Sequence, residues 1–184
     1  MDEIYGTGYM RALEDAGCSI SGKEMTLLGS GGAASALLAQ AALDGASAIH
    51  VFARKGNSWN MIAEEIKRIH AHTSCKVTLN ELHNETSLRE KIAASAFLVN
   101  ASSVGMAPNT GDCLIPDASF FHPGLVVSDV IYNPKKTKLL LMAEEAGLST
   151  FNGMYMLLYQ GAEAFRLWTG KEMPVALIKK EVFS

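Results

Sequence analysis

Hydrophobic residues along the chain alternate between short continuous runs, typical of buried strands, and the three- to four-residue spacing of amphipathic helices. The runs predict strands over residues 24–28, 48–52, 76–79, 97–99, 125–128 and 149–151. The spaced positions predict helices over residues 8–17, 33–43, 59–69, 87–94, 136–146 and 154–169. Strands that alternate with helices of this length predict an α/β fold, in which helices cover both faces of a parallel sheet.

The helix expected over residues 59–69 has the clearest hydrophobic face. Trp59, Ile62, Ile66 and Ile69 recur at helical spacing, so we expect them to form one buried stripe. The first and last predicted helices lie outside the alternation of strand and helix. We therefore expect these two helices to pack on something other than the sheet of this domain.

A glycine-rich segment follows the first predicted strand directly. Residues 29–34 read Gly-Ser-Gly-Gly-Ala-Ala, which fits the dinucleotide pattern G-x-G-x-x-A. Gly29 permits a tight turn, Gly31 lets the backbone approach a pyrophosphate, and Ala34 lets helix and strand pack closely. The amides at the helix start then face the phosphates. The motif alone also fits a turn without a ligand, but its place in the first β-α-β unit favours a Rossmann-like, doubly wound domain.

The end of the second predicted strand bears on the choice between NAD and NADP. An NAD-specific site has an Asp or Glu there, which binds the ribose 2′-hydroxyl. This chain has Ala53, Arg54 and Lys55 instead, with two cations and no acid. An arginine can pair with a 2′-phosphate and stack on adenine. The pattern favours NADP, with a solvated basic turn as the alternative interpretation.

Composition and charge exclude several other classes of protein. A net charge of -3 provides no basic surface for nucleic acid or anionic lipid. The first residues lack the features of a signal peptide, and no apolar run approaches the roughly 20 residues of a membrane span. Cys18, Cys75 and Cys113 form no C-x-x-C pair, which indicates reduced, inert thiols. His70 and His72 would not share a helix face, so we expect no metal site there. Reduced thiols are typical of the cytoplasm, so we expect a cytoplasmic domain.

Four stretches resemble the family of shikimate and quinate/shikimate dehydrogenases. Residues 6–13 look like the helix after the family's N-T-D-G segment, and residues 100–106 are similar to its N-x-[TS]-x-x-G-M loop. Residues 129–140 match D-x-x-Y-x-P-x-x-T-x-L-L, and residues 152–170 match G-x-x-M-L-x-x-Q-G-A followed by W-T-G. The resemblance implies reversible hydride transfer between NADP(H) and the carbonyl of 3-dehydroshikimate, with 3-dehydroquinate and quinate as a second pair. NAD is the alternative cofactor.

The resemblance also implies roles for individual residues. Those expected to bind the cofactor are Gly29, Ser30, Gly31, Gly32, Ala33, Ala53, Arg54, Lys55, Ser102, Ser103, Val130, Ile131, Tyr132, Asn133, Gly153 and Met156. Gly153 would contact the nicotinamide amide through its backbone, and Met156 would pack against the ring. Tyr132 and Gln160 would hydrogen-bond the substrate. From the residues alone, Tyr132 could equally be a buried ring with a satisfied hydroxyl, and Gln160 could lie at a solvent edge.

The chain departs from the family in a way that bears on activity. The family has a substrate-binding domain of about one hundred residues or more before this region. That domain brings a lysine that handles the proton together with an aspartate of the N-T-D-G segment, and neither is retained here. Tyr5 precedes Gly6 where the family has the aspartate, and Asp2 lies three positions too early. A tyrosine hydroxyl is a poor substitute for a paired acid and base at neutral pH.

We therefore expect residues 1–184 to form a single NAD(P)-binding domain that is inactive alone. It would be a truncated form, a gene fragment, or a subunit that meets its missing half in trans. The helical segments 1–20 and 153–184 would contact the absent domain, and shikimate, 3-dehydroshikimate or quinate would bind only with it. Association as a homo-oligomer stays open.

Two other functions are alternatives to this dehydrogenase interpretation. One is a non-catalytic, NADP-binding regulatory module. The other is a Rossmann-like transferase for a different nucleotide, against which Arg54, Lys55 and the loop at 100–106 argue.

Overall fold

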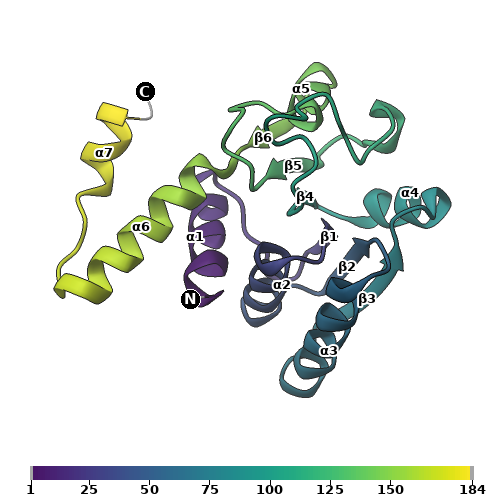
Figure 1. The fold of residues 1–184 in the computed structure, drawn as a ribbon, viewed down its shortest axis with the longest axis horizontal. Coiled ribbons are helices and arrows are strands. Elements are labelled where there is room, and N and C mark those ends of the chain that lie inside the picture. Colours follow the sequence, from purple (N-terminus) through teal and green to yellow (C-terminus); the bar gives the residue numbers. More distant parts are fainter. Residues whose placement is uncertain (1, 183–184) are drawn as a thin grey trace.

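The structure, a computed structural model, describes residues 2–182 and is built around a six-stranded parallel sheet (Figure 1). The strands are β1 (Glu24–Leu28), β2 (Ala48–Ala53), β3 (Lys76–Glu81), β4 (Phe97–Asn100), β5 (Val126–Asp129) and β6 (Ser149–Phe151). The helices are α1 (Asp2–Asp15), α2 (Gly32–Leu43), α3 (Asn57–His72), α4 (Glu85–Ala94), α5 (Lys138–Glu145), α6 (Gly153–Thr169) and α7 (Val175–Val182), with a 3₁₀ turn at Ala118–Phe120. The strand order β3-β2-β1-β4-β5-β6 is that of a Rossmann-like, doubly wound sheet, which confirms the predicted fold class.

Helices cover both faces of the sheet, because successive strand residues point to opposite sides. Met25 and Leu27 of β1 belong to a core shared with α1, α2 and α3, whereas Leu28 belongs to a second core under α4 and α5. Figure 1 shows α1, α2 and α3 on one side of the sheet and α4 and α5 on the other. The hydrophobic runs of β1, β2, β4 and β5 therefore become strands that are buried on both faces, whereas the edge strands β3 and β6 are partly exposed.

Helix α1 lies between α2 and α6 and is part of the core. Tyr9 and Leu13 are each 1% exposed, and the Tyr9 hydroxyl lies 2.6 Å from Ser128 Oγ at the end of β5. A Cβ on Gly6 would lie 2.6 Å from the Ala36 carbonyl oxygen of α2. A Cβ on Gly8 would lie 2.9 Å from the Met156 carbonyl oxygen of α6. The helix packs mainly on α2 and α6, and Tyr9 reaches the sheet at β5 and β6, so the expectation that it packs on something other than the sheet is only partly met.

The hydrophobic stripe of α3 is buried in part. Ile62, Ile66 and Ile69 pack into the first core, as predicted. Trp59 does not join them. It is half-buried and lies with Leu79 at a shallow hollow beside the end of β3, so its prediction as core was wrong.

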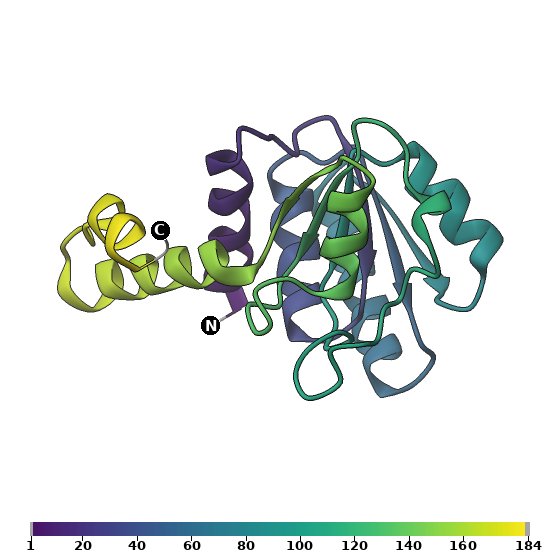
Figure 2. The ribbon, with the colours of Figure 1, turned by 90° about the horizontal axis from the view of Figure 1, so that it is seen from above.

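The C-terminal helices extend away from the sheet (Figure 2). Trp168 is 84% exposed, and none of residues 175–182 in α7 is buried. Lys179 joins α7 to the body, because it pairs with Asp15 of α1 and lies 5.2 Å from the ring centres of Tyr155 and Tyr159. Among residues 2–182 there is no helix of the length and hydropathy that crossing a membrane requires.

Candidate functional site

A pocket of about 620 Å³ opens at the carboxyl ends of β1, β2, β4 and β5, where the strand order reverses between β1 and β4. This is where doubly wound sheets bind ligands. The predicted cofactor residues that line it are Gly29, Ser30, Gly31, Gly32, Ala33, Ala53, Arg54, Ser102, Ser103, Val130, Ile131, Tyr132 and Asn133. Residues brought to the pocket without having been predicted are Phe52, Ser58, Leu82, Ala101, Val104, Met106, Ala107 and Leu114.

The glycine-rich loop forms the floor of the pocket under the start of α2. Gly29 has a φ of +123°, and a Cβ there would lie 2.8 Å from the Ala101 carbonyl oxygen, so only glycine fits. Cβ atoms on Gly31 and Gly32 would meet nothing within 4 Å among the described residues. The N-cap residue of α2 is Gly31, which has no side chain to cap the first amides of the helix. Free amides beside open space at a helix start fit a pyrophosphate.

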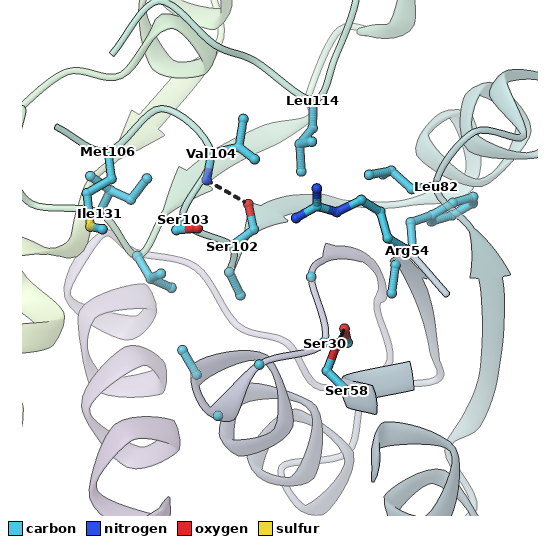
Figure 3. Close-up of a pocket in the computed structure, with 18 of the residues that line it drawn as sticks. Ser30, Arg54, Ser58, Leu82, Ser102, Ser103, Val104, Met106, Leu114 and Ile131 are labelled. Atoms are coloured by element: carbon cyan, nitrogen blue, oxygen red, sulfur yellow. Dashed lines mark hydrogen bonds between the residues drawn. The ribbon is translucent and has the colours of Figure 1, made fainter. Parts of the chain in front are cut away.

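The first turn of α3 contributes a hydroxyl that the sequence did not reveal. Ser58 Oγ lies 2.9 Å from Ser30 Oγ, so α3 begins directly beside the glycine loop. Figure 3 shows these two side chains facing each other below the pocket. The signal in the sequence is weak, because a serine near the start of a helix is common for capping alone.

Arg54 and Lys55, adjacent in sequence, have different surroundings. The Arg54 side chain extends from the end of β2 into the pocket, towards Ser102 and Leu114 (Figure 3). It makes no hydrogen bond or ion pair with any residue from 2 to 182. Lys55 lies outside the pocket lining and forms an ion pair with Glu81 at the end of β3. The guanidinium is therefore the cation available to a ligand.

A buried carboxyl ties together the two loops on the other side of the pocket. Asp129 is 1% exposed and accepts hydrogen bonds from Asn100 Nδ2 at 3.0 Å, the Ile131 amide at 2.9 Å and Thr137 Oγ1 at 2.9 Å. Asn100 Oδ1 in turn accepts from Ser102 Oγ at 2.6 Å. Burial raises the pKa of Asp129 to about 6, although the hydrogen bonds from its neighbours oppose the rise. This network fixes the loops after β4 and β5 relative to each other.

Comparison with known proteins shows what the chain is similar to. The model of the shikimate 5′-dehydrogenase C-terminal domain matches residues 153–183. A shikimate dehydrogenase (NADP(+)) of Listeria monocytogenes serotype 4b (strain F2365) is 49% identical over 178 residues, which cover 97% of this chain and 61% of the relative. The crystal structure of a Listeria monocytogenes shikimate 5-dehydrogenase in complex with shikimate and NAD has a TM-score of 0.93 at 48% identity, over 96% of this chain and 61% of that one.

Over nearly its whole length the chain is similar to shikimate dehydrogenases, and its C-terminal residues match the model of their C-terminal domain. A quinate/shikimate dehydrogenase of Escherichia coli O139:H28 (strain E24377A / ETEC) is 42% identical over 175 residues, 95% of this chain and 61% of that protein. The chain thus spans about 61% of the length of these dehydrogenases.

The residues that the family resemblance assigns to the reacting end of the site are only partly brought together. Tyr132 lines the pocket and is 52% exposed, so the alternative of a buried ring is wrong. Gly153 lies behind the pocket wall, where its amide donates to the Ile131 carbonyl at 3.0 Å. Met156 is 4% exposed in the first core, and Gln160 on α6 packs against Gly8. Gly153, Met156 and Gln160 are outside the lining of the pocket.

The pocket has few groups that can transfer a proton. Of the residues that line it within the described chain, Arg54 and Tyr132 alone carry ionisable side chains. Burial raises the pKa of the Cys75 and Cys113 thiols, which disfavours the reactive thiolate. Residues 2–182 contain no cluster of three or more His, Cys, Asp or Glu side chains that could hold a metal. The arrangement suits a dinucleotide. The described side chains that line the pocket include no acid and base suited to proton transfer.

Proposed function

We propose that this chain is the NADP(H)-binding part of a shikimate or quinate/shikimate dehydrogenase, with NAD as an alternative cofactor. The observation that carries the proposal is the Arg54 guanidinium, which pairs with no described side chain and extends into a pocket floored by the glycine-rich start of α2. The relatives support it, since one is named an NADP(+) enzyme and another was crystallised with NAD. We further propose that it acts in the cytoplasm.

Each part of the pocket suits a different part of the cofactor. The amides of residues 30–33 would bind the pyrophosphate at the positive end of the α2 dipole. Arg54 would form charge-assisted hydrogen bonds to the 2′-phosphate and stack on the adenine. Ser102, Ser103 and residues 130–133 would hold the nicotinamide half, with Tyr132 at the substrate side.

The reaction we propose for the whole protein is the reversible reduction of 3-dehydroshikimate, or of 3-dehydroquinate. When bound, NADP(H) supplies the hydride chemistry, and the chain described here binds and orients. The proton must be handled by a lysine and an aspartate that this chain does not provide to the pocket. Tyr132 and Gln160 would hydrogen-bond the substrate only when a substrate domain, or a partner that carries one, completes the site.

Calorimetric titration of the purified chain with NADP and with NAD, each with and without shikimate, tests the proposal. We expect NADP to bind more tightly than NAD, with no effect of shikimate, because only Tyr132 of the two predicted substrate contacts lines the pocket within the described residues. If neither dinucleotide binds, the proposed function is wrong. If shikimate strengthens NADP binding, the chain has a substrate site of its own and the dependence on another domain is wrong.

A non-catalytic, NADP-binding regulatory module is the second candidate, and Tyr5 at the position of the family's aspartate favours it. This candidate also predicts NADP binding without an effect of shikimate. The two are distinguished by adding the substrate domain of a related dehydrogenase as a separate chain. Restored turnover supports the enzyme, whereas persistent inactivity with intact NADP binding supports the module.

A further inference from the structure

The ion pair between Lys55 and Glu81 lies beside the pocket without lining it. Lys55 follows Arg54 at the end of β2, and its ammonium group pairs with the Glu81 carboxylate at the end of β3. The two side chains are 67% and 55% exposed. Of the two cations in the basic turn, one therefore extends into the pocket and the other is held against a neighbouring strand.

The sheet itself fixes the position of Glu81. Glu81 lies opposite Ala53 in the parallel ladder of β2 and β3, and the Leu82 amide donates to the Ala53 carbonyl at 2.9 Å. Ala53 and Leu82 both line the pocket. Because neighbouring strands are about 4.8 Å apart, Glu81 is one strand spacing from the end of the pocket that holds Arg54.

The charge of Glu81 affects the two dinucleotides differently. A phosphate monoester carries a charge of about −1.5 to −2 near neutral pH, whereas the 2′-hydroxyl of NAD is neutral. A nearby carboxylate repels the phosphate, and its pairing with Lys55 removes a cation that could attract it. Both effects disfavour NADP and leave NAD almost unchanged.

We propose that Glu81, from outside the pocket, lowers the preference of this site for NADP over NAD by holding Lys55 away from it. The inference rests on the proposed function and adds a residue that sets the selectivity of the same site. The end of β2 lacks the acid that would bind the 2′-hydroxyl of NAD. In its place, Glu81 at the end of β3 would affect the choice of dinucleotide by pairing with Lys55.

The test compares the dissociation constants of NADP and NAD for the full chain and its Glu81→Gln variant, measured by calorimetry at low and high salt. We expect the ratio of NADP to NAD affinity to rise about three- to tenfold in Glu81→Gln, the range for one exposed charge near another. The rise should shrink at high salt, because the Debye length falls from about 10 Å at 0.1 M to about 3 Å at 1 M. Glu64→Gln is the matched control, since Glu64 pairs with Lys67 on the surface of α3, and its ratio should stay unchanged.

Lys55→Gln separates the two effects of Glu81. In the wild type it should change NADP affinity less than about twofold, as expected for an exposed lysine that is already paired. In the Glu81→Gln background it should remove most of the gain. An unchanged ratio in Glu81→Gln, or an equal rise in Glu64→Gln, overturns the inference while the proposed function stands. If the wild type binds neither dinucleotide, the proposed function fails, and this inference fails with it.

Discussion

At the scale of single residues, Asp129 organises one side of the pocket. Its carboxyl receives hydrogen bonds from the end of β4, from the loop after β5 and from the N-cap of α5. A carboxyl with three donors is usually held ionised, yet burial prevails here and raises its pKa from 3.8 to about 6. Protonation of Asp129, which shapes the site, therefore stabilises the folded chain relative to the unfolded chain.

This pKa predicts a pH dependence of stability. Between pH 4 and 6 the folded chain holds a proton on Asp129 that the unfolded chain has lost, so the free energy of unfolding should fall as pH rises. The fall should reach about 2 kcal/mol across this range. Urea denaturation of wild type and Asp129→Asn at several pH values measures it. His50, whose pKa is lowered chiefly by burial, gives a slope of opposite sign in both proteins, so their difference isolates Asp129. Parallel pH profiles would contradict the assignment.

The residues of the site could be predicted from sequence where one continuous segment carries the signal. The glycine loop and Arg54 follow directly from their strands, and both line the pocket. Ser58, Leu82 and Glu81 were missed, because they come to the site through the position of α3 and the pairing of β3 with β2. A local pattern does not specify which strands will be neighbours.

At the scale of elements, α1 joins α2 to α6 through two glycines on its surface. Gly6 allows close contact with α2, and Gly8 allows close contact with α6. The hydrophobic pattern predicts the start of this helix at residue 8, and the glycines at positions 6 and 8 weaken a helix locally. Tertiary packing outweighs that local preference, so α1 begins at Asp2. The predicted strands, by contrast, all exist within two residues of their expected ends, since long buried runs carry a strong local signal.

Alanine substitution of Gly6 tests this packing. The new methyl group would lie 2.6 Å from a backbone oxygen of α2, which cannot move without moving the helix. We expect Gly6→Ala to lower the free energy of unfolding by about 1–3 kcal/mol. Gly161→Ala on α6 is the control, because a Cβ there meets nothing within 4 Å in the described chain and should stabilise by about 0.5–1 kcal/mol. Equal stabilisation by both substitutions in urea denaturation would show that α1 does not pack in this way.

At the scale of the whole molecule, the chain combines a pocket at the carboxyl ends of its strands with an exposed C-terminal extension. Leu167, Trp168 and Leu177 are 58%, 84% and 58% exposed on α6 and α7. Hydrophobic side chains gathered at one end of a molecule often mark an interaction surface. The fold class and the order of elements could be predicted from the sequence, but the course of α7 could not, because its residues bury nothing against the sheet.

The composition of the pocket predicts that the chain alone does not turn over shikimate. The ionisable side chains that line it within residues 2–182 are a guanidinium and a phenol, and neither suits proton transfer at neutral pH. NADPH formation from shikimate and NADP, followed by absorbance, should stay at the level without protein. Steady NADPH formation by the purified chain would show that it supplies its own acid and base.

The most direct test of the central claim, that the pocket binds NADP through its 2′-phosphate, is the affinity of Arg54→Ala for both dinucleotides. Loss of a charge-assisted pair with phosphate is worth about 1.5–3 kcal/mol, so NADP binding should weaken roughly 10- to 100-fold while NAD binding changes less than about threefold. Arg68→Ala, which removes an exposed arginine paired with Glu65 on α3, should leave both affinities unchanged. An equal loss for NADP and NAD in Arg54→Ala, or no loss for either, would contradict the account.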